Sequence, residues 1–153
     1  MNNYFFDELA LLSEFKKSIN EAYKNDTINW YEIFGGRDVE IYESIQVSQP
    51  KFPCFVVTMI PTPNQATITS CETELYTQVY VRIEHYTQKV DDIGKEELGI
   101  MINQRLKQYF QKKYNILITD NREIASPDNS IYRRRIEARI VFNNKDKIIY
   151  QGG

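Results

Sequence analysis

The sequence predicts an α+β fold, in which two main helices pack on one face of an antiparallel or mixed sheet of about four to five strands. Apolar and polar residues alternate over 75–86 and again over 133–142, which indicates two strands with one buried face each. Apolar residues recur at three- and four-residue spacing over 4–25 and 98–110, which is typical of amphipathic helices. A near-continuous apolar run over 54–60 indicates a further strand that is covered on both faces.

The first helix is expected from about Tyr4 to Asn25, with acidic residues in its first turns and lysines later, as the helix dipole favours. Its predicted buried stripe consists of Phe5, Leu9, Leu12, Phe15, Ile19 and Ala22 or Tyr23. Residues 27–51 are less regular. Within them we expect Trp30 to lie in the core and an edge strand to begin near Val39.

A long antiparallel hairpin is expected next. Pro53 opens its first strand, and Pro61–Asn64 forms its tip, because proline is tolerated at the first position of a strand and favoured in turns. The second strand runs from about Ala66 to Tyr86, with a break near Ser70. The predicted buried residues of its second half are Leu75, Thr77, Val79, Val81 and Ile83.

A second helix follows the hairpin. Asp91 or Asp92 is expected to cap it, Glu96 and Glu97 lie near its positive end, and Asn115 is expected to stop it. Its predicted core stripe consists of Leu98, Met101 or Ile102, Leu106, and Tyr109 or Phe110.

Two further strands, over 116–125 and 131–142, are expected to form the last hairpin. The predicted buried residues of the last strand are Ile136, Ala138, Ile140 and Phe142. We therefore expect residues 1–143 to form a single α+β domain. Residues 144–153 are expected to form a polar tail that is mobile unless a partner orders it.

Composition excludes several classes of protein. The chain has 153 residues, 42% of them hydrophobic, which fits one globular domain. Its formal net charge is −2 and its pI about 5.5, whereas a general nucleic-acid binder is expected to be basic. The sequence has neither an apolar run of membrane-spanning length nor a secretory signal, so we expect no membrane partner. Cys54 and Cys71 are expected to be reduced thiols in a chain that folds in the cytosol.

No set of residues suggests catalysis, a metal or a cofactor. His85 is the only histidine and falls on the buried side of its strand, so we expect it to be packed or hydrogen-bonded rather than a ligand. Cys54 and Cys71 are expected to act as small buried hydrophobic residues. The paired acids near the second helix are better explained by helix capping. The sequence therefore predicts a protein that is not an enzyme and has neither a metal nor another cofactor.

The most unusual feature is the polar side of the two alternating strands, which we interpret as a surface for subunits or partners. Its residues are Tyr76, Tyr80, Arg82, Glu84, Arg133, Arg135, Glu137 and Arg139. Tyrosine and arginine are favoured at protein interfaces. Two other interpretations stay open. The arginines could pair across strands with acids such as Glu84, Glu123 or Glu137, or they could bind phosphates while the tyrosines stack on single-stranded bases.

The order of features resembles the tail terminator, or tail completion (tail-to-head joining), proteins of tailed bacteriophages. The resemblance covers about residues 4–143. It rests on the N-terminal helix, the strand Phe52-Pro-Cys-Phe-Val-Val-Thr58, the strand Glu72-Thr-Glu-Leu-Tyr-Thr-Gln-Val-Tyr-Val-Arg-Ile83, the capped helix and the final strand Tyr132-Arg-Arg-Arg-Ile-Glu-Ala-Arg-Ile-Val-Phe142. These are patterns of residue type rather than invariant chemical motifs. The segment Thr27–Gln49 departs from the short connection that is expected there.

The resemblance implies a structural protein of the virion neck. Such a protein forms a ring, usually a hexamer, that caps the tail tube, ends its polymerisation and joins the tail to the head connector. The implied partners are its own copies, the tail tube protein and a head-completion or connector protein, with genomic DNA only passing through the lumen. The implied location is the virion, after assembly in the host cytoplasm. The alternatives are another neck or tail-capping component of similar fold and a sheet that binds single-stranded nucleic acid.

Overall fold

A computed structural model of the protein describes residues 5–24, 28–36, 39–42, 50–60, 67–70, 73–114 and 116–151. The helices in these ranges are α1 (Glu8–Lys24), α2 (Trp30–Ile33) and α3 (Lys95–Lys113). The strands are β1 (Glu40–Tyr42), β2 (Cys54–Met59), β3 (Thr67–Ser70), β4 (Thr73–Thr87), β5 (Leu117–Ile124), β6 (Tyr132–Asn143) and β7 (Ile148–Ile149).

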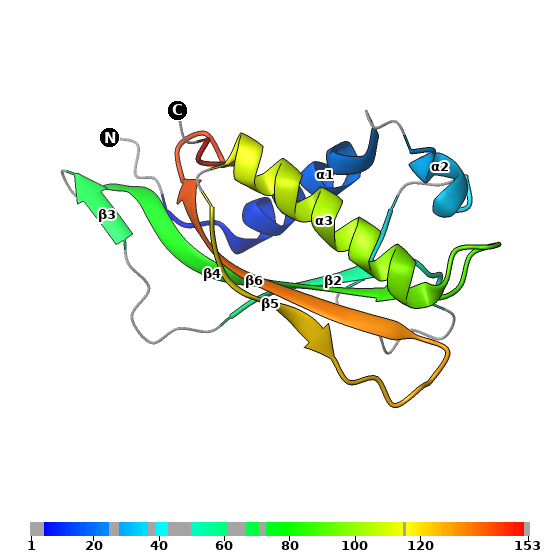
Figure 1. Ribbon diagram of the computed structural model, residues 1–153. Helices are drawn as coiled ribbons and strands as arrows, with labels where there is room; N and C mark the ends of the chain where they lie inside the picture. Colours follow the sequence, from blue (N-terminus) through cyan, green and yellow to red (C-terminus); the bar gives the residue numbers. More distant parts are fainter. Residues whose placement is uncertain are drawn as a thin grey trace.

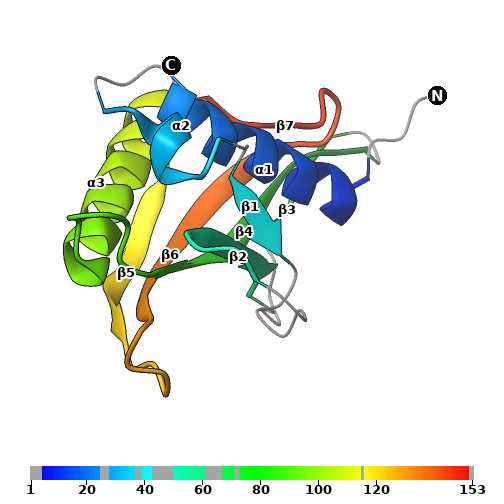
Figure 2. The same ribbon diagram turned by 90° about the vertical axis from the view of Figure 1, so that its right-hand side faces the viewer.

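The strands form one mixed sheet. Its main order is β1-β2-β4-β6-β5, while β3 pairs with β4 and β7 pairs with β6. Among the described strands, only the β1–β2 pairing is parallel. Both long helices, α1 and α3, lie on the same face of the sheet (Figures 1 and 2). The predicted α+β class is therefore confirmed, and the sheet is larger than expected because the short strands β3 and β7 extend it.

The core lies between this sheet and the two long helices. The residues predicted to be buried on β4 and β6 face each other across the ladder, with Val79 opposite Ile140 and Ile83 opposite Ile136. This follows from the two-residue period of a strand, which places alternate side chains on one face. Trp30 is also buried, as predicted, and packs against Tyr23.

The predicted stripe of α1 is only half right. Phe15, Ile19 and the residues near position 22 are buried, but Leu9 is 79% exposed and Phe5, which precedes the helix, is 59% exposed. Leu11 takes the place of Leu9 in the core. Residues two apart are separated by about 200° around the helix axis, so their side chains point in nearly opposite directions. Leu9 and Leu11 therefore cannot share one face. Because α1 packs through Leu11, Leu9 is turned to the surface.

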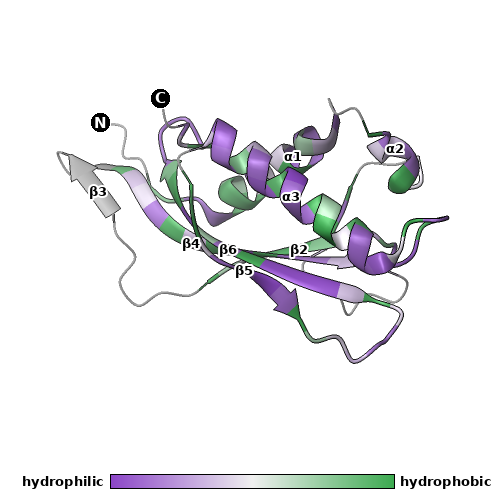
Figure 3. Ribbon diagram, in the orientation of Figure 1, coloured by the Kyte–Doolittle hydropathy of each residue, from purple (hydrophilic) through white to green (hydrophobic). Residues whose placement is uncertain are grey.

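Helix α3 buries the predicted stripe through Leu98, Ile102, Leu106 and Phe110. Hydrophilic and hydrophobic segments accordingly alternate along it in Figure 3. The predicted cap is wrong, because the N-cap is Gly94, which makes no side-chain capping hydrogen bond. Asp91 lies instead in a preceding turn with a φ of 50°, closed by backbone hydrogen bonds between Val90 and Ile93. An aspartate tolerates this left-handed conformation better than most residues do.

Gly99 permits the close approach of α3 to the sheet. A Cβ at this position would overlap the buried ring of Tyr132 and would lie 3.1 Å from Thr87 Oγ1. We expect Gly99→Ala to lower the free energy of unfolding by about 1–2 kcal/mol in urea denaturation, because overpacking outweighs the better helix propensity of alanine. Gly94→Ala is the matched control, since no atom lies within 4 Å of its added Cβ. Equal effects of the two substitutions would contradict this assignment.

The predicted antiparallel pairing of these strands is confirmed for β2 and β4, with Val57 opposite Ile83, but β3 lies between them in the chain, so they do not form a simple hairpin. The predicted tip lies outside the described residues. The expected single strand over 66–86 is instead two strands, because β3 pairs antiparallel with β4 and Ser70 lies opposite Thr73. Figure 1 shows this β3–β4 hairpin at one end of the sheet, beyond the two long helices.

The segment expected as a loose polar tail belongs to the fold through its first residues. Asn143 Oδ1 accepts backbone hydrogen bonds from Lys145 and Asp146, which closes a turn back toward β6. Strand β7 then pairs with the end of β6, and Ile149 is buried in the core. Asn144 is buried as well and donates a hydrogen bond to Thr77 Oγ1. The fold therefore continues past residue 143, where the sequence predicts its end, because the buried Ile149 anchors a segment that is polar on average.

Candidate assembly surface

All eight predicted surface residues lie on the face of the sheet that points away from α1 and α3. They occupy alternate positions of β4 and β6, and the register places Arg82 opposite Glu137 and Glu84 opposite Arg135. No described helix covers this outer face (Figure 1). The structure thus brings the predicted residues together on neighbouring strands.

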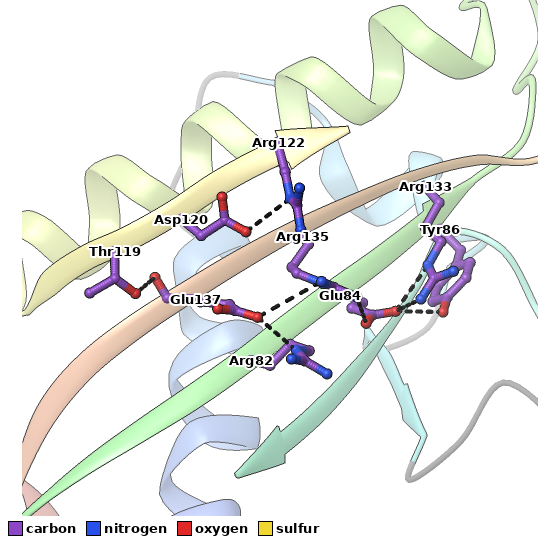
Figure 4. Close-up of polar contacts among 9 residues, drawn as sticks. All are labelled: Arg82, Glu84, Tyr86, Thr119, Asp120, Arg122, Arg133, Arg135 and Glu137. Carbon is purple, nitrogen blue, oxygen red and sulfur yellow. Dashed lines mark hydrogen bonds and ion pairs between the residues drawn. The ribbon is translucent and has the colours of Figure 1, made fainter. Parts of the chain in front are cut away.

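Glu84 is the centre of the polar contacts on the outer face (Figure 4). Its Oε2 accepts hydrogen bonds from Arg133 Nε at 3.0 Å, Arg133 Nη2 at 2.5 Å and the Tyr86 hydroxyl at 2.8 Å. Its Oε1 accepts one from Arg135 Nη2 at 3.3 Å. Charge-assisted bonds of this kind are stronger than neutral ones. One buried carboxylate therefore holds three side chains of β4 and β6 in place.

These contacts shift the pKa values of Glu84 and Tyr86. Burial raises the pKa of Glu84, but the hydrogen bonds from Arg133 and Tyr86 and the charges of the two arginines outweigh it, so the pKa is lowered overall. Burial and the hydrogen bond to Glu84 raise the pKa of Tyr86. At neutral pH Glu84 is therefore ionised and Tyr86 is a hydrogen-bond donor.

A second carboxylate extends the same set of contacts. Glu137 Oε1 accepts a hydrogen bond from Arg82 Nε at 2.9 Å and lies 3.9 Å from Arg135 Nη1. Cross-strand pairing, one of the three interpretations of the arginines, is thus observed for Glu84 and Glu137. Glu123 is not part of it, because it pairs in register with Arg134 and lies on the other face of the sheet. We call the contacts centred on Glu84 and Glu137 the ionic lattice.

The outer face also has a largely apolar end, which the alternation of residues did not predict. In register across three strands, Tyr80 lies beside Arg139 and Arg139 beside Leu117. Further along, the ring of Tyr76 makes an edge contact with Tyr150 at 5.9 Å. We call this surface the tyrosine patch, and it consists of Tyr76, Tyr80, Leu117, Arg139, Val141, Ile148 and Tyr150. Leu117, Ile148 and Tyr150 are 50%, 37% and 40% exposed.

A second polar network, also missed, lies between α3 and the sheet. Asn103 is buried on α3, where its Oδ1 lies 3.1 Å from His85 Nε2 and its Nδ2 donates to Asn121 Oδ1 at 3.0 Å. Arg134 joins the network by donating to Asn121 at 3.4 Å and to the Tyr132 hydroxyl at 3.1 Å. The sequence does contain one sign of this network. Asn103 is a polar residue inside the apolar stripe of α3, and a buried polar side chain needs hydrogen-bond partners.

The environment of His85 suits a structural role. Its side chain is fully buried, and within the described residues its Nδ1 has no hydrogen-bond partner. Burial lowers its pKa to about 4, with a further lowering by the Arg134 charge, against the opposing effect of the hydrogen bond to Asn103. The expectation of a packed, hydrogen-bonded histidine is therefore confirmed. Cys54 is also buried as predicted, whereas Cys71 lies outside the described residues.

Across the described part of the chain, no three histidine, cysteine, aspartate or glutamate residues are grouped closely enough to hold a metal ion. None of the helices in the same ranges combines the length and apolar character needed to cross a membrane. Comparison with known proteins found no family model that matches the chain and no curated protein with significant similarity to it. The outer face of the sheet, with its ionic lattice and tyrosine patch, is the candidate functional site.

Proposed function

We propose that this protein is a structural subunit of a bacteriophage neck. In this proposal its copies form a ring, expected to be a hexamer, that caps the tail tube, ends tube polymerisation and joins the tail to the head connector. The observation that carries the proposal is the outer face of the sheet, where an internally paired ionic lattice lies beside an exposed patch of tyrosine and aliphatic side chains. This arrangement suits binding to another protein surface.

The ionic lattice supports this function through its rigidity. Arg133 and Arg135 are already held by Glu84, so they lose little conformational freedom when a partner covers them. Tyrosine and arginine are also the residues most enriched in the centres of protein interfaces. A subunit that must repeat the same contact around a ring benefits from a surface that is fixed before assembly.

The β3–β4 hairpin offers a second means of contact between subunits. Among the described strands β3 pairs only with β4, and β5 pairs only with β6, so each leaves one backbone edge open. An open edge can accept a strand from a neighbouring chain. The position of the hairpin at the end of the sheet places its edge where a neighbour can reach it (Figure 1).

The pairing of the arginines disfavours the nucleic-acid alternative. Arg82, Arg133 and Arg135 are each bonded to a carboxylate of the same chain. A phosphate would have to displace these carboxylates and would meet their negative charge. We therefore favour protein assembly as the role of this surface.

Assembly is tested on the full chain by native mass spectrometry and negative-stain microscopy. We expect six-fold rings at micromolar concentration, and binding of these rings to the ends of purified tail tubes. A protein that stays monomeric and leaves tube ends free would contradict the proposal. In the same preparation, binding of a fluorescent single-stranded oligonucleotide is expected to be absent at low salt. Salt-dependent binding would instead favour the nucleic-acid alternative.

A further inference from the structure

Arg139 is the exception among the arginines of the outer face. Arg82, Arg122, Arg133 and Arg135 each have a carboxylate oxygen at 3.3 Å or less. Within the described residues Arg139 makes no ion pair, although it belongs to the same strand as Arg133 and Arg135. Arg139 lies where the tyrosine patch borders the ionic lattice, but its nearest outer-face carboxylate on β6, Glu137, already pairs with Arg82 and Arg135. An unpaired guanidinium group there is best satisfied by a carboxylate supplied from outside the chain.

The surroundings of Arg139 favour a protein partner. Tyr80 and Leu117 flank it in register on the neighbouring strands, and half of the Leu117 side chain is exposed. A charged group that is surrounded by aromatic and aliphatic side chains is shielded from water once a partner covers them, which strengthens its pairing with an opposite charge. The tyrosine patch therefore fits a partner surface that is itself apolar and carries one acidic residue.

The start of α1, together with Phe5 just before it, offers such a surface on the same chain. Leu9 and Phe5 are among the most exposed large apolar side chains of the described residues, and Glu8 lies between them in sequence. Glu8 is exposed and, within the described part of the chain, has no ion pair. Asp7, by contrast, is occupied, because its Oδ1 accepts a hydrogen bond from the backbone of Ala10. We call Phe5, Glu8 and Leu9 the α1 patch.

The two patches are complementary in charge and alike in apolar character. One carries an unpaired arginine and the other an unpaired glutamate. They belong to opposite layers of the molecule, since the tyrosine patch lies on the outer face of the sheet and α1 lies on the other face (Figures 1 and 2). Within one chain the sheet therefore separates Glu8 from Arg139, although the Phe5 carbonyl accepts a hydrogen bond from Lys147 beside the tyrosine patch. Two copies can bring the two charged side chains together.

We propose that the α1 patch of one copy docks on the tyrosine patch of the next copy, with Glu8 facing Arg139. This contact joins two different surfaces, so it repeats from copy to copy and produces a ring when the rotation closes. The inference rests on the proposed ring function and adds to it which surfaces of the subunit meet.

Charge exchange tests the pairing of Glu8 with Arg139. Glu8→Arg and Arg139→Glu are each expected to weaken assembly at least about 30-fold, the effect typical of an interface hot spot. The double variant, which restores opposite charges in exchanged positions, is expected to regain assembly. Lys89→Glu is the control, because it makes the same charge change at an exposed residue after β4 that belongs to neither patch, and it is expected to assemble normally. Circular dichroism checks that every variant is folded.

A mixing experiment tests that the two patches bind each other. Leu9→Asp destroys the α1 patch and leaves the tyrosine patch intact, whereas Arg139→Glu does the reverse. Each variant alone is expected to be monomeric in native mass spectrometry. Their mixture is expected to form a one-to-one dimer and nothing larger, because it contains a single intact pair of patches.

The outcomes separate this inference from the proposed function. If the wild-type protein forms rings and both single variants form them equally well, the inference is wrong and the ring function stands. If both variants are monomeric but their mixture gives no dimer, the two patches do not bind each other. If the wild-type protein itself is monomeric and ignores tail tubes, the proposed function fails as well.

Discussion

Replacement of Glu84 by glutamine is expected to lower the free energy of unfolding by about 2–3 kcal/mol, which makes it one of the two largest effects expected for this protein. The neutral amide has nearly the shape of the carboxylate but cannot balance two guanidinium charges. The side chains of Arg133 and Arg135 are only 24% and 17% exposed, so water replaces the lost partner poorly. The Tyr86 hydroxyl also loses its charged acceptor. Urea denaturation at neutral pH measures the loss.

Asp120→Asn is the matched control for this substitution. Asp120 also bonds an arginine on the outer face, but the side chains of Arg122 and Asp120 are 61% and 30% exposed. Exposed ion pairs contribute only about 0–1 kcal/mol, so we expect little change in stability. If the two substitutions had the same effect, Glu84 would not be the centre of the ionic lattice.

Acidification is expected to remove about 3 kcal/mol of stability through His85 alone, because its pKa falls from 6.5 to about 4 on folding. A lowered folded pKa means that the unfolded chain binds the proton more readily. The contribution of His85 is therefore complete above pH 6.5 and is lost as the pH falls from 6.5 toward 4.

Several groups surround the imidazole. Asn103 accepts or donates at Nε2, Arg134 contributes a positive charge, and the Phe55 ring packs at 5.8 Å.

The variant His85→Gln isolates this effect. An amide can keep a hydrogen bond to Asn103 but does not titrate, so the variant is expected to lose less stability than the wild type between pH 7 and pH 5. The slope of stability against pH is the measured quantity, since the variant is also expected to be less stable at pH 7 because its packing is altered. Identical slopes for both proteins would show that His85 does not determine acid sensitivity in this range.

Much of the sheet was predictable because a strand has a simple period. The side chains of Val79, Ile83 and Ile136 alternate with polar ones, and only one assignment of faces buries them all. The same period placed Arg82 and Glu137 together on the other face. The stripe of α3 was predictable except at two positions, where the sequence left Met101 or Ile102 and Tyr109 or Phe110 open and the packing buries Ile102 and Phe110.

Other features depend on contacts that a local pattern does not contain. Leu9 and Leu11 are both apolar, and only the position of α1 on the sheet decides which of them is buried. The sequence predicts a break in the strand near Ser70, but it does not show that the chain reverses direction there and forms a hairpin. The tyrosine patch was missed because Leu117 and Tyr150 are distant in the sequence and come together only through the pairing of each with β6.

The ladder between β4 and β6 also constrains how the protein is made. It runs from Tyr76 opposite Asn143 to Thr87 opposite Tyr132, with all of α3 and β5 between the two strands in the chain. During translation β4, the longest strand, therefore emerges from the ribosome well before its main neighbour exists. Its unpaired edge must stay protected from other nascent chains until β6 is synthesised. The N-terminal half of the chain thus has no complete fold of its own, and folding is completed only near the end of synthesis.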